Sequence, residues 1–312
     1  MSRRDSSEAP DNQGLSKVAA WRQLLRLANV FTALSNVLAG ALIAQETWQP
    51  TTPLALLLAS SALLYCAGMV LNDVFDAELD AKERPERPIP SGRISREEAA
   101  LVGWSLLATG VGAAAWASYL LASIAPIILG ASLAVTIVMY DGGLKSMWAG
   151  PLAMGWCRTL NVLLGASLAG TAVDGPAWLY AGVVGLYTIG LTYLARDEAT
   201  TSSAGGIRTA GLLLLAAFGL FFAFSFSVTL AVPDLVWFVA WGSAIELAGL
   251  AFFTAARQPS PKRVQLGVKR LILLFIVIDA VACLAVGGWK PAGLVLSLLV
   301  PTLQLSRKTA MT

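Results

Sequence analysis

The stretch "LNDVFDAELDAKERPERPIPSG", residues 71–92, places acidic and then basic side chains directly after a long apolar run. If the helix continues past Leu71 at about 100° per residue, four polar side chains fall on an arc of roughly 100°. These are Asn72, Asp73, Asp76 and Asp80. Carboxylates this close repel one another unless a cation binds them. Hard oxygen ligands suit Mg²⁺, which takes one or two carboxylates and lets substrate phosphates complete its shell.

The overlapping segment "KERPERPIPSGR", residues 82–93, adds Lys82, Arg84, Arg87 and Arg93, together with three prolines and a glycine. Proline and glycine favour extended or turn conformations. Carboxylates for a metal, followed by cations beside it, are typical of a diphosphate site. The alternative is a solvated helix end with an ordinary cytoplasmic basic loop, and the shared helical face favours the diphosphate site.

The composition indicates a membrane protein. The chain has 312 residues, of which 56% are hydrophobic and 13% charged, against about 25% charged in soluble proteins. Repeated apolar stretches long enough to span the bilayer predict an all-α protein that crosses the membrane many times. The chain contains no histidine, which excludes catalysis and metal binding by that residue. The three cysteines lie in apolar segments, as small buried residues do.

Nine spans are expected, with a tenth, shorter segment that spans, re-enters or lies in the interface. A disordered cytoplasmic tail is expected at residues 1–22, followed by one transmembrane domain at residues 23–306. The expected spans are residues 28–46, 53–72, 97–120, 122–140, 149–171, 177–195, 209–231, 236–255 and 268–288, and the tenth segment is 291–305.

Charge asymmetry between the loops predicts the orientation. The cations gather in the N-terminal tail and in alternate loops, at residues 73–96, at Lys145, at 196–208 and at 257–270. Lys and Arg are retained on the cytoplasmic side of a membrane. We therefore expect the N-terminus and the acidic stretch to face the cytoplasm, in the cell membrane.

Several of these segments resemble the UbiA superfamily of intramembrane prenyltransferases. "NDVFDAELD" is similar to its NDxxDxxxD motif, "RPIPSG" to its RPLPSG-like loop and "YDGGLK" to its YxxxLK element. "GPLAMGWCRTLNVLLG" and "RQPSPKRVQLGVKRLILLFIVIDA" are most similar to the EboC-like branch. The resemblance implies a bundle with a central cavity open to the cytoplasm. It also implies a Mg²⁺ cofactor and, as partners, a polyprenyl diphosphate or phosphate, a small acceptor and the lipid bilayer, without nucleic acid; the oligomeric state stays open.

The family places a second acidic motif, DxxxD, after its sixth helix. The counterpart here is "YLARDEATTSSAGG", in which Asp197 takes the first position and Thr201 stands where the second Asp is expected. Glu198 is adjacent and is an alternative ligand. The departure leaves open whether one metal ion or two are bound.

The resemblance also assigns roles to single residues. It implies catalytic roles for Asp76, Asp197 and Lys145, and metal binding by Asn72, Asp73, Asp76, Asp80, Asp197 and Glu198. Diphosphate contacts are expected from Arg84, Arg87, Lys145, Arg158 and Arg26, and a substrate cavity lined by Asn36, Tyr140, Asn161 and Tyr193.

Three ionisable residues lie inside apolar spans, where such residues mark functional sites by default. Arg158 is expected to serve the site, or to reach the interface from near its helix end. Asp279 and Glu246 are expected to form hydrogen bonds in the bundle interior or to contact the distal acceptor.

The leading hypothesis is Mg²⁺-dependent prenyl transfer from a polyprenyl diphosphate to an acceptor. One alternative is transfer of a phosphorylated sugar or cyclitol to polyprenyl phosphate. Another is a non-catalytic transporter or lipid-binding protein on the same scaffold.

Overall fold

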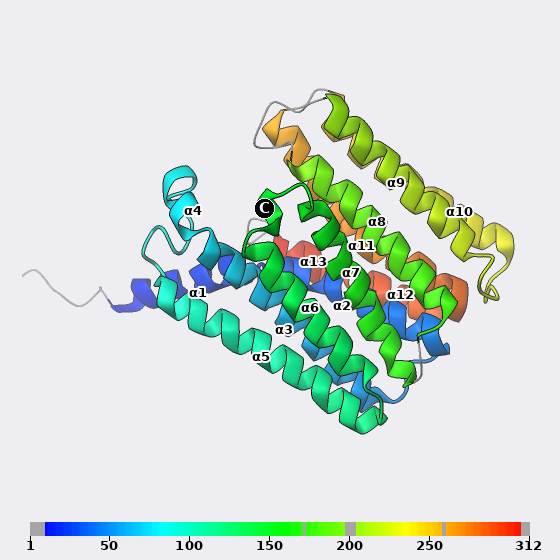
Figure 1. The fold of residues 1–312 in the computed structure, drawn as a ribbon. Coiled ribbons are helices and arrows are strands. Elements are labelled where there is room, and N and C mark those ends of the chain that lie inside the picture. Colours follow the sequence, from blue (N-terminus) through cyan, green and yellow to red (C-terminus); the bar gives the residue numbers. More distant parts are fainter. Residues whose placement is uncertain (1–9, 171–172, 197–203, 258–259, 307–312) are drawn as a thin grey trace, which may run out of the picture.

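The computed structural model describes residues 10–170, 173–196, 204–257 and 260–306, and these residues form helices joined by short connections (Figure 1). The α-helices are α1 (Pro10–Leu25), α2 (Leu27–Gln45), α3 (Thr51–Phe75), α4 (Ala77–Glu83), α5 (Arg96–Leu121), α6 (Ala125–Asp141), α7 (Gly150–Ala166), α8 (Gly175–Arg196), α9 (Ala204–Phe224), α10 (Asp234–Ala256), α11 (Pro261–Gly287), α12 (Trp289–Ser297) and α13 (Leu299–Ser306). Two short 3₁₀ turns follow α6 and α7, at η1 (Leu144–Ser146) and η2 (Ser167–Ala169).

Membrane-spanning length is met by eight helices among the described residues. Helix α6 is an apolar helix of 17 residues at the place of the expected fourth span. The expected tenth segment forms two short helices, α12 and α13. The protein is therefore an all-helical, multi-pass membrane protein, and the count of nine spans stays a prediction.

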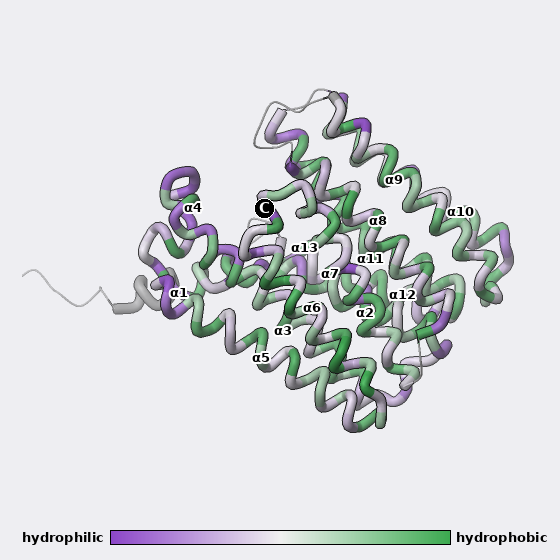
Figure 2. The backbone as a smooth tube through the Cα atoms, viewed as in Figure 1, coloured by the Kyte–Doolittle hydropathy of each residue, from purple (hydrophilic) through white to green (hydrophobic). Residues whose placement is uncertain are grey.

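The helices differ in how much of their surface the bundle covers. Helix α2 packs against α3, α7 and α11. In the span Lys17–Gln45, which includes α2, 78% of the most apolar 18-residue segment is buried. Helices α5 and α10 lie at opposite edges of the bundle in Figure 1, and only 22% of the corresponding apolar segment is buried in each of them. Apolar residues cover both edge helices, and hydrophilic residues gather near helix ends (Figure 2). The edge helices therefore present their outer faces to lipid.

Helices α2 and α7 meet through their backbones. A methyl group at Gly40 would lie 2.1 Å from the carbonyl oxygen of Val162, and one at Gly165 would lie 2.1 Å from that of Val37. Small residues permit such close approach in membrane bundles, where dispersion contacts take the place of the hydrophobic effect. This contact fixes the register of two helices that both carry polar side chains.

Helix α1 takes in residues 10–22, which the sequence assigned to a disordered tail. Ala20 and Leu24 are fully buried in a cluster with Val70 and Val74 of α3. This cluster stabilises the helix although the composition of the segment is polar. Arg26, with φ of 44°, lies between α1 and α2 and turns the chain into the bundle.

Candidate active site

One pocket lies at the end of the bundle where α3, α6 and α8 end. Its volume is about 440 Å³. Leu64, Leu133, Ile137 and Met154 contribute to its apolar wall. Its polar lining consists of Arg26, Ser61, Tyr65, Asn72, Asp76, Arg84, Arg87, Tyr140, Asp141, Arg158, Asn161, Thr192 and Arg196. A pocket with a charged end and an apolar wall suits a ligand with a charged head and an apolar tail.

Helix α3 supplies one polar face of the pocket. Ser61, Tyr65, Asn72 and Asp76 follow one another at intervals of four, seven and four residues, which places them on one side of a helix. Asp76 itself is the first residue beyond α3, with φ of −85° and ψ of 0°. The helix therefore ends where its polar face reaches the mouth of the pocket.

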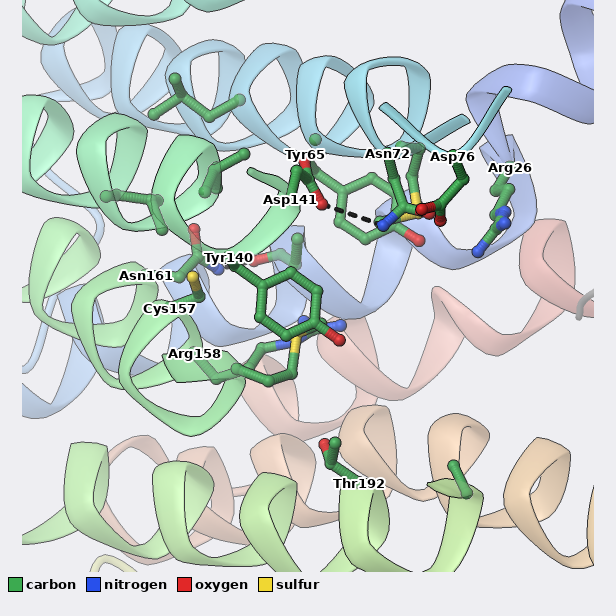
Figure 3. Close-up of a pocket in the computed structure, with 18 of the residues that line it drawn as sticks. Arg26, Tyr65, Asn72, Asp76, Tyr140, Asp141, Cys157, Arg158, Asn161 and Thr192 are labelled. Atoms are coloured by element: carbon green, nitrogen blue, oxygen red, sulfur yellow. Dashed lines mark hydrogen bonds between the residues drawn. The ribbon is translucent and has the colours of Figure 1, made fainter. Parts of the chain in front are cut away.

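Asn72, Asp76, Asp141 and Lys145 form what we term the rim cluster. Nζ of Lys145 lies 2.7 Å from Oδ1 of Asp76. Nδ2 of Asn72 donates a hydrogen bond to Oδ1 of Asp141 at 2.9 Å (Figure 3). The rim cluster thus brings together the end of α3, the end of α6 and the turn η1.

Arg196, the last residue of α8, holds the turn that carries Lys145. Its Nη2 donates hydrogen bonds to the carbonyl oxygens of Lys145 and Met147, at 2.7 Å and 2.5 Å. A guanidinium that bonds two backbone carbonyls fixes their separation, because its donors have a fixed geometry. Arg196 therefore positions Lys145 and also lines the pocket.

The four polar side chains predicted on one helical face separate into two pairs. Asn72 and Asp76 line the pocket, whereas Asp73 and Asp80 are buried beside Arg87. Nη1 of Arg87 lies 2.6 Å from Oδ2 of Asp80 and 3.5 Å from Oδ1 of Asp73. Asn72 and Asp73 are neighbours in α3, where successive side chains point about 100° apart, and Asp80 lies in α4, beyond the end of α3 at Phe75.

The cations around this rim have different surroundings. Arg26 lines the pocket, and its Nη2 lies 3.4 Å from Oδ1 of Asp73. Arg87 also lines the pocket and joins Asp73 to Asp80. Arg84 lines the pocket from an exposed position after α4. The loop predicted to bind diphosphate therefore does reach the pocket.

Arg158 of α7 enters the pocket from the other side of the bundle. Its Nη1 donates to Oδ1 of Asn36 at 3.1 Å and its Nη2 to Oγ1 of Thr32 at 3.0 Å. The guanidinium carbon lies 4.7 Å from the ring centre of Phe275, a favourable cation–π distance. No carboxylate forms a salt bridge with Arg158 among the described residues.

Behind Arg158 lies what we term the inner cluster: Asp279 with Ser35, Asn36 and Tyr180. Asp279 is fully buried in α11 and accepts hydrogen bonds from Ser35 Oγ at 2.5 Å, Asn36 Nδ2 at 2.8 Å and Tyr180 OH at 2.5 Å. The expectation of a hydrogen-bonded aspartate in the bundle interior is confirmed. Since Asn36 also accepts from Arg158, the inner cluster supports the arginine of the pocket.

Three other expected residues lie elsewhere. Asn36 is fully buried in the inner cluster, and it does not line the pocket itself. Tyr193 packs against the hydrophobic core, while the adjacent Thr192 lines the pocket, because neighbouring helical residues point about 100° apart. The interior position expected for Glu246 is wrong, since it lies on an exposed face of α10. A helix that is apolar all round gives no sequence signal for which face is buried.

The remaining site predictions fall as follows. Tyr140 and Asn161 both line the pocket, as expected of cavity residues. Asn161 accepts from Ser61 Oγ at 2.7 Å and donates to the carbonyl oxygen of Ala33 at 2.8 Å. Asp197, Glu198 and Thr201 lie outside the described residues, so the second acidic motif stays a prediction.

Sequence reasoning missed Ser61, Tyr65 and Asp141. A helical projection backward from Asp76 and Asn72 finds Tyr65 and Ser61, because the same face continues at intervals of four and seven residues. Asp141 has no such signal. It is the last residue of an otherwise apolar helix, and its contact with Asn72 is visible only in three dimensions.

The chemistry of the rim cluster fits a Mg²⁺ ion shared with a ligand. Among the described residues, no three acidic, histidine or cysteine side chains form a complete protein metal site. The rim cluster offers two carboxylates and the amide oxygen of Asn72, and Oδ2 of Asp141 is buried without a hydrogen-bond partner in the part of the chain described. Mg²⁺ is commonly bound by one or two carboxylates and completes its octahedron with phosphate oxygens.

Fold and site together define a class: a multi-pass helical membrane protein with a pocket that has a charged end and an apolar wall. The sequence profile described as the UbiA prenyltransferase family matches residues 33–276, which is more than half of the chain. The chain belongs to the UbiA prenyltransferase family and is a prenyltransferase.

Individual relatives agree with this assignment. Digeranylgeranylglyceryl phosphate synthase of Ignicoccus hospitalis is 28% identical over 290 residues, covering 84% of this chain and 92% of the relative. A solved structure described as that of digeranylgeranylglyceryl phosphate synthase in membranes has a TM-score of 0.66 at 19% identity, covering 86% of this chain and 98% of the other. A UbiA homologue of Archaeoglobus fulgidus bound to GPP and Mg²⁺ has a TM-score of 0.58 at 15% identity, covering 84% and 99%. At these identities the solved structures show a shared fold.

Proposed function

We propose that this chain transfers the prenyl group of a prenyl diphosphate to a small acceptor, with Mg²⁺ and the diphosphate held at the rim cluster. One observation carries the proposal: the Asp76–Lys145 salt bridge lies beside the Asn72–Asp141 hydrogen bond at the charged end of a pocket with an apolar wall. Oxygens for a metal and a cation for phosphate are thus adjacent, and the apolar wall suits an isoprenoid tail. The structure of the Archaeoglobus fulgidus homologue with GPP and Mg²⁺ supports the choice of ligand.

The reaction needs the bond between the prenyl carbon and the diphosphate oxygen to break. Negative charge then grows on the leaving diphosphate, and fixed cations close to it lower the barrier. Arg26, which lines the pocket, and Lys145, which pairs with the pocket residue Asp76, are our candidates for this role. Mg²⁺, when bound, neutralises part of the same charge.

The acidic residues divide this work in our proposal. Asn72 and Asp76 bind the metal, while Asp73 and Asp80 orient Arg87 toward the pocket. Arg84 and Arg87 contact the outer phosphate. Asp197 or Glu198 supplies a further acidic ligand, as the sequence motif predicts.

The surroundings of Arg158 indicate the chemical class of the acceptor. A guanidinium without a carboxylate partner attracts an anionic group, and it would repel an allylic cation placed beside it. We therefore propose an acceptor with a hydroxyl group and an acidic group such as a phosphate, with the acidic group on Arg158. This agrees with the name of the relatives, in which a glyceryl phosphate is prenylated.

The orientation and the branch of the family belong to the same proposal. The pocket lies at the end of the bundle that carries Lys145, Arg196 and the basic loop after α4, and positive loops stay in the cytoplasm. We place this end at the cytoplasmic face of the cell membrane. The likeness to the EboC-like branch stays a prediction from its two sequence segments.

The test is Asp76→Asn in purified protein supplied with Mg²⁺, a panel of prenyl diphosphates and hydroxyl acceptors with and without a phosphate. Pyrophosphate release is expected to fall by about 10²-fold or more, the effect of removing one transition-state contact. Asp234→Asn, at the exposed start of α10, is the matched control and is expected to keep full activity. A normal rate for Asp76→Asn contradicts the proposal. A product that carries a phosphorylated sugar or cyclitol on polyprenyl phosphate favours the alternative reaction.

A further inference from the structure

Asp141 is the carboxylate of the pocket that the proposed mechanism leaves without a role. It is the last residue of α6, and it is 4% exposed. Its Oδ1 accepts a hydrogen bond from Asn72, whereas its Oδ2 has no hydrogen-bond partner among the described residues. Figure 3 shows its carboxylate directed toward Asn72 and Asp76. A residue that lines the pocket thus carries a buried acceptor without a hydrogen-bond partner in the described residues.

The other carboxylates nearby all have a cation. Asp76 pairs with Lys145 at 2.7 Å, and Asp80 pairs with Arg87 at 2.6 Å. Asp73 lies 3.4 Å from Arg26. Asp141 forms no salt bridge in the part of the chain described, although a buried charge without a partner is costly. Asp141 therefore differs from its neighbours in having no ion-pair partner in the described residues.

The backbone around Asp141 also favours a positive ion. Helix α3 ends at Phe75 and helix α6 ends at Asp141, so two C-terminal ends meet at the rim cluster. The last carbonyl groups of a helix carry partial negative charge, which attracts cations and disfavours an isolated carboxylate. Two helix ends, two carboxylates and one amide oxygen all point to the same kind of ligand, a small hard cation.

The geometry points to Asp141 as a direct ligand of the metal ion, through Oδ2, while Asn72 fixes its other oxygen. This inference rests on the proposed function, since the ion is the Mg²⁺ that arrives with the prenyl diphosphate. It assigns to α6 an acidic ligand from outside both acidic motifs.

Asp141→Asn separates a ligand from a merely structural residue. The amide oxygen still accepts the hydrogen bond from Asn72, so a structural role is preserved while the charge is removed. The probe is Mn²⁺, whose free concentration is followed by electron paramagnetic resonance in the presence of geranylgeranyl thiolodiphosphate, an analogue that ionises poorly. The dissociation constant of Mn²⁺ is expected to rise about tenfold or more.

Asp141→Ser is the second variant, for the case in which the asparagine variant does not fold, and the same rise is expected. Asp76→Asn provides the positive reference and Asp234→Asn the control with wild-type affinity. Wild-type Mn²⁺ affinity in a folded Asp141 variant, with impaired binding in Asp76→Asn, overturns the assignment of Asp141 and leaves the proposed function intact. Failure of the wild-type protein to bind Mn²⁺ with the analogue overturns the proposed function and the role of Asp141 together.

Discussion

The rim cluster and the inner cluster both place aspartates among membrane helices, yet their partners differ. Asp279 of the inner cluster is fully buried and accepts from three neutral donors, Ser35, Asn36 and Tyr180. Asp141 of the rim cluster is almost as buried, but one of its oxygens has no partner among the described residues. In our proposal the carboxylate with complete partners stabilises the bundle, and the one with an unpartnered oxygen binds the metal ion. The number of partners, more than the depth of burial, distinguishes these two proposed functions.

The largest difference between the two clusters is expected when the unfolding free energies of Asp279→Ala and Asp76→Ala are compared. Removing Asp279 leaves three buried donors without their acceptor, at about 1–3 kcal/mol each. The free energy of unfolding is expected to fall by about 3 kcal/mol or more. Asp76→Ala removes one ion pair at the rim, whose side chains are 20% and 22% exposed, and is expected to cost less than Asp279→Ala because it leaves one donor group rather than three without a partner. Unfolding of both variants in mixed SDS micelles measures the difference.

Activity should follow the opposite order. Asp76→Ala is expected to lose turnover in the fraction that stays folded. The loss of activity in Asp279→Ala is expected to follow from unfolding and from displacement of Arg158. Equal losses of stability in the two variants would remove the distinction between the clusters.

A smaller effect is expected from Gly165→Ala, which tests the contact between α2 and α7. These helices carry Asn36 and Arg158, so the contact joins the inner cluster to the pocket. The added methyl group would lie 2.1 Å from the carbonyl oxygen of Val37, and overpacking of this kind costs about 1–3 kcal/mol. The melting temperature in detergent should fall.

Gly219→Ala is the matched control, because no atom lies within 4 Å of the methyl group that it adds in α9. Alanine is the better helix former by about 1 kcal/mol, so this variant should melt at the same temperature or higher. Equal melting temperatures for Gly165→Ala and the wild-type protein would argue against a close helix contact.

The smallest effect belongs to Tyr180→Phe. Asp279 keeps its bonds to Ser35 and Asn36, so the variant should lose only about 1 kcal/mol of unfolding free energy. Tyr140→Phe, whose ring lines the pocket, should unfold like the wild-type protein. If the two variants unfold alike, Tyr180 adds nothing to the inner cluster.

The parts of the fold and site that the sequence predicts are those with local patterns. Hydropathy indicates the helices, and the motif at residues 71–92 predicts that Asn72 and Asp76 belong to a site. The break after Phe75 was not predicted, because the acidic stretch has a composition that continues a helix equally well. It places Asp80 in α4, where its carboxylate pairs with Arg87.

The contacts of the site that the sequence does not predict are formed between residues far apart in the chain. Asp141 and Asn72 are 69 residues apart, and Asp279 and Ser35 are 244 apart. No periodicity in the sequence connects such positions, since each pair is created by the packing of separate helices. Glu246 was placed in the interior wrongly for a related reason: in an apolar helix at the edge of the bundle, the sequence does not indicate which face is buried.

The contact at Gly40 and Gly165 has a consequence for how this reaction centre is kept accurate. The guanidinium of Arg158 and the amide of Asn36 are aligned because the main chains of α2 and α7 are in direct contact. This alignment depends on the absence of a side chain at Gly40 and at Gly165. A motif search looks for functional groups and passes over such positions. A methyl group added at Gly165 or Gly40 would push α2 and α7 apart and displace Arg158, which lies two helical turns from Gly165.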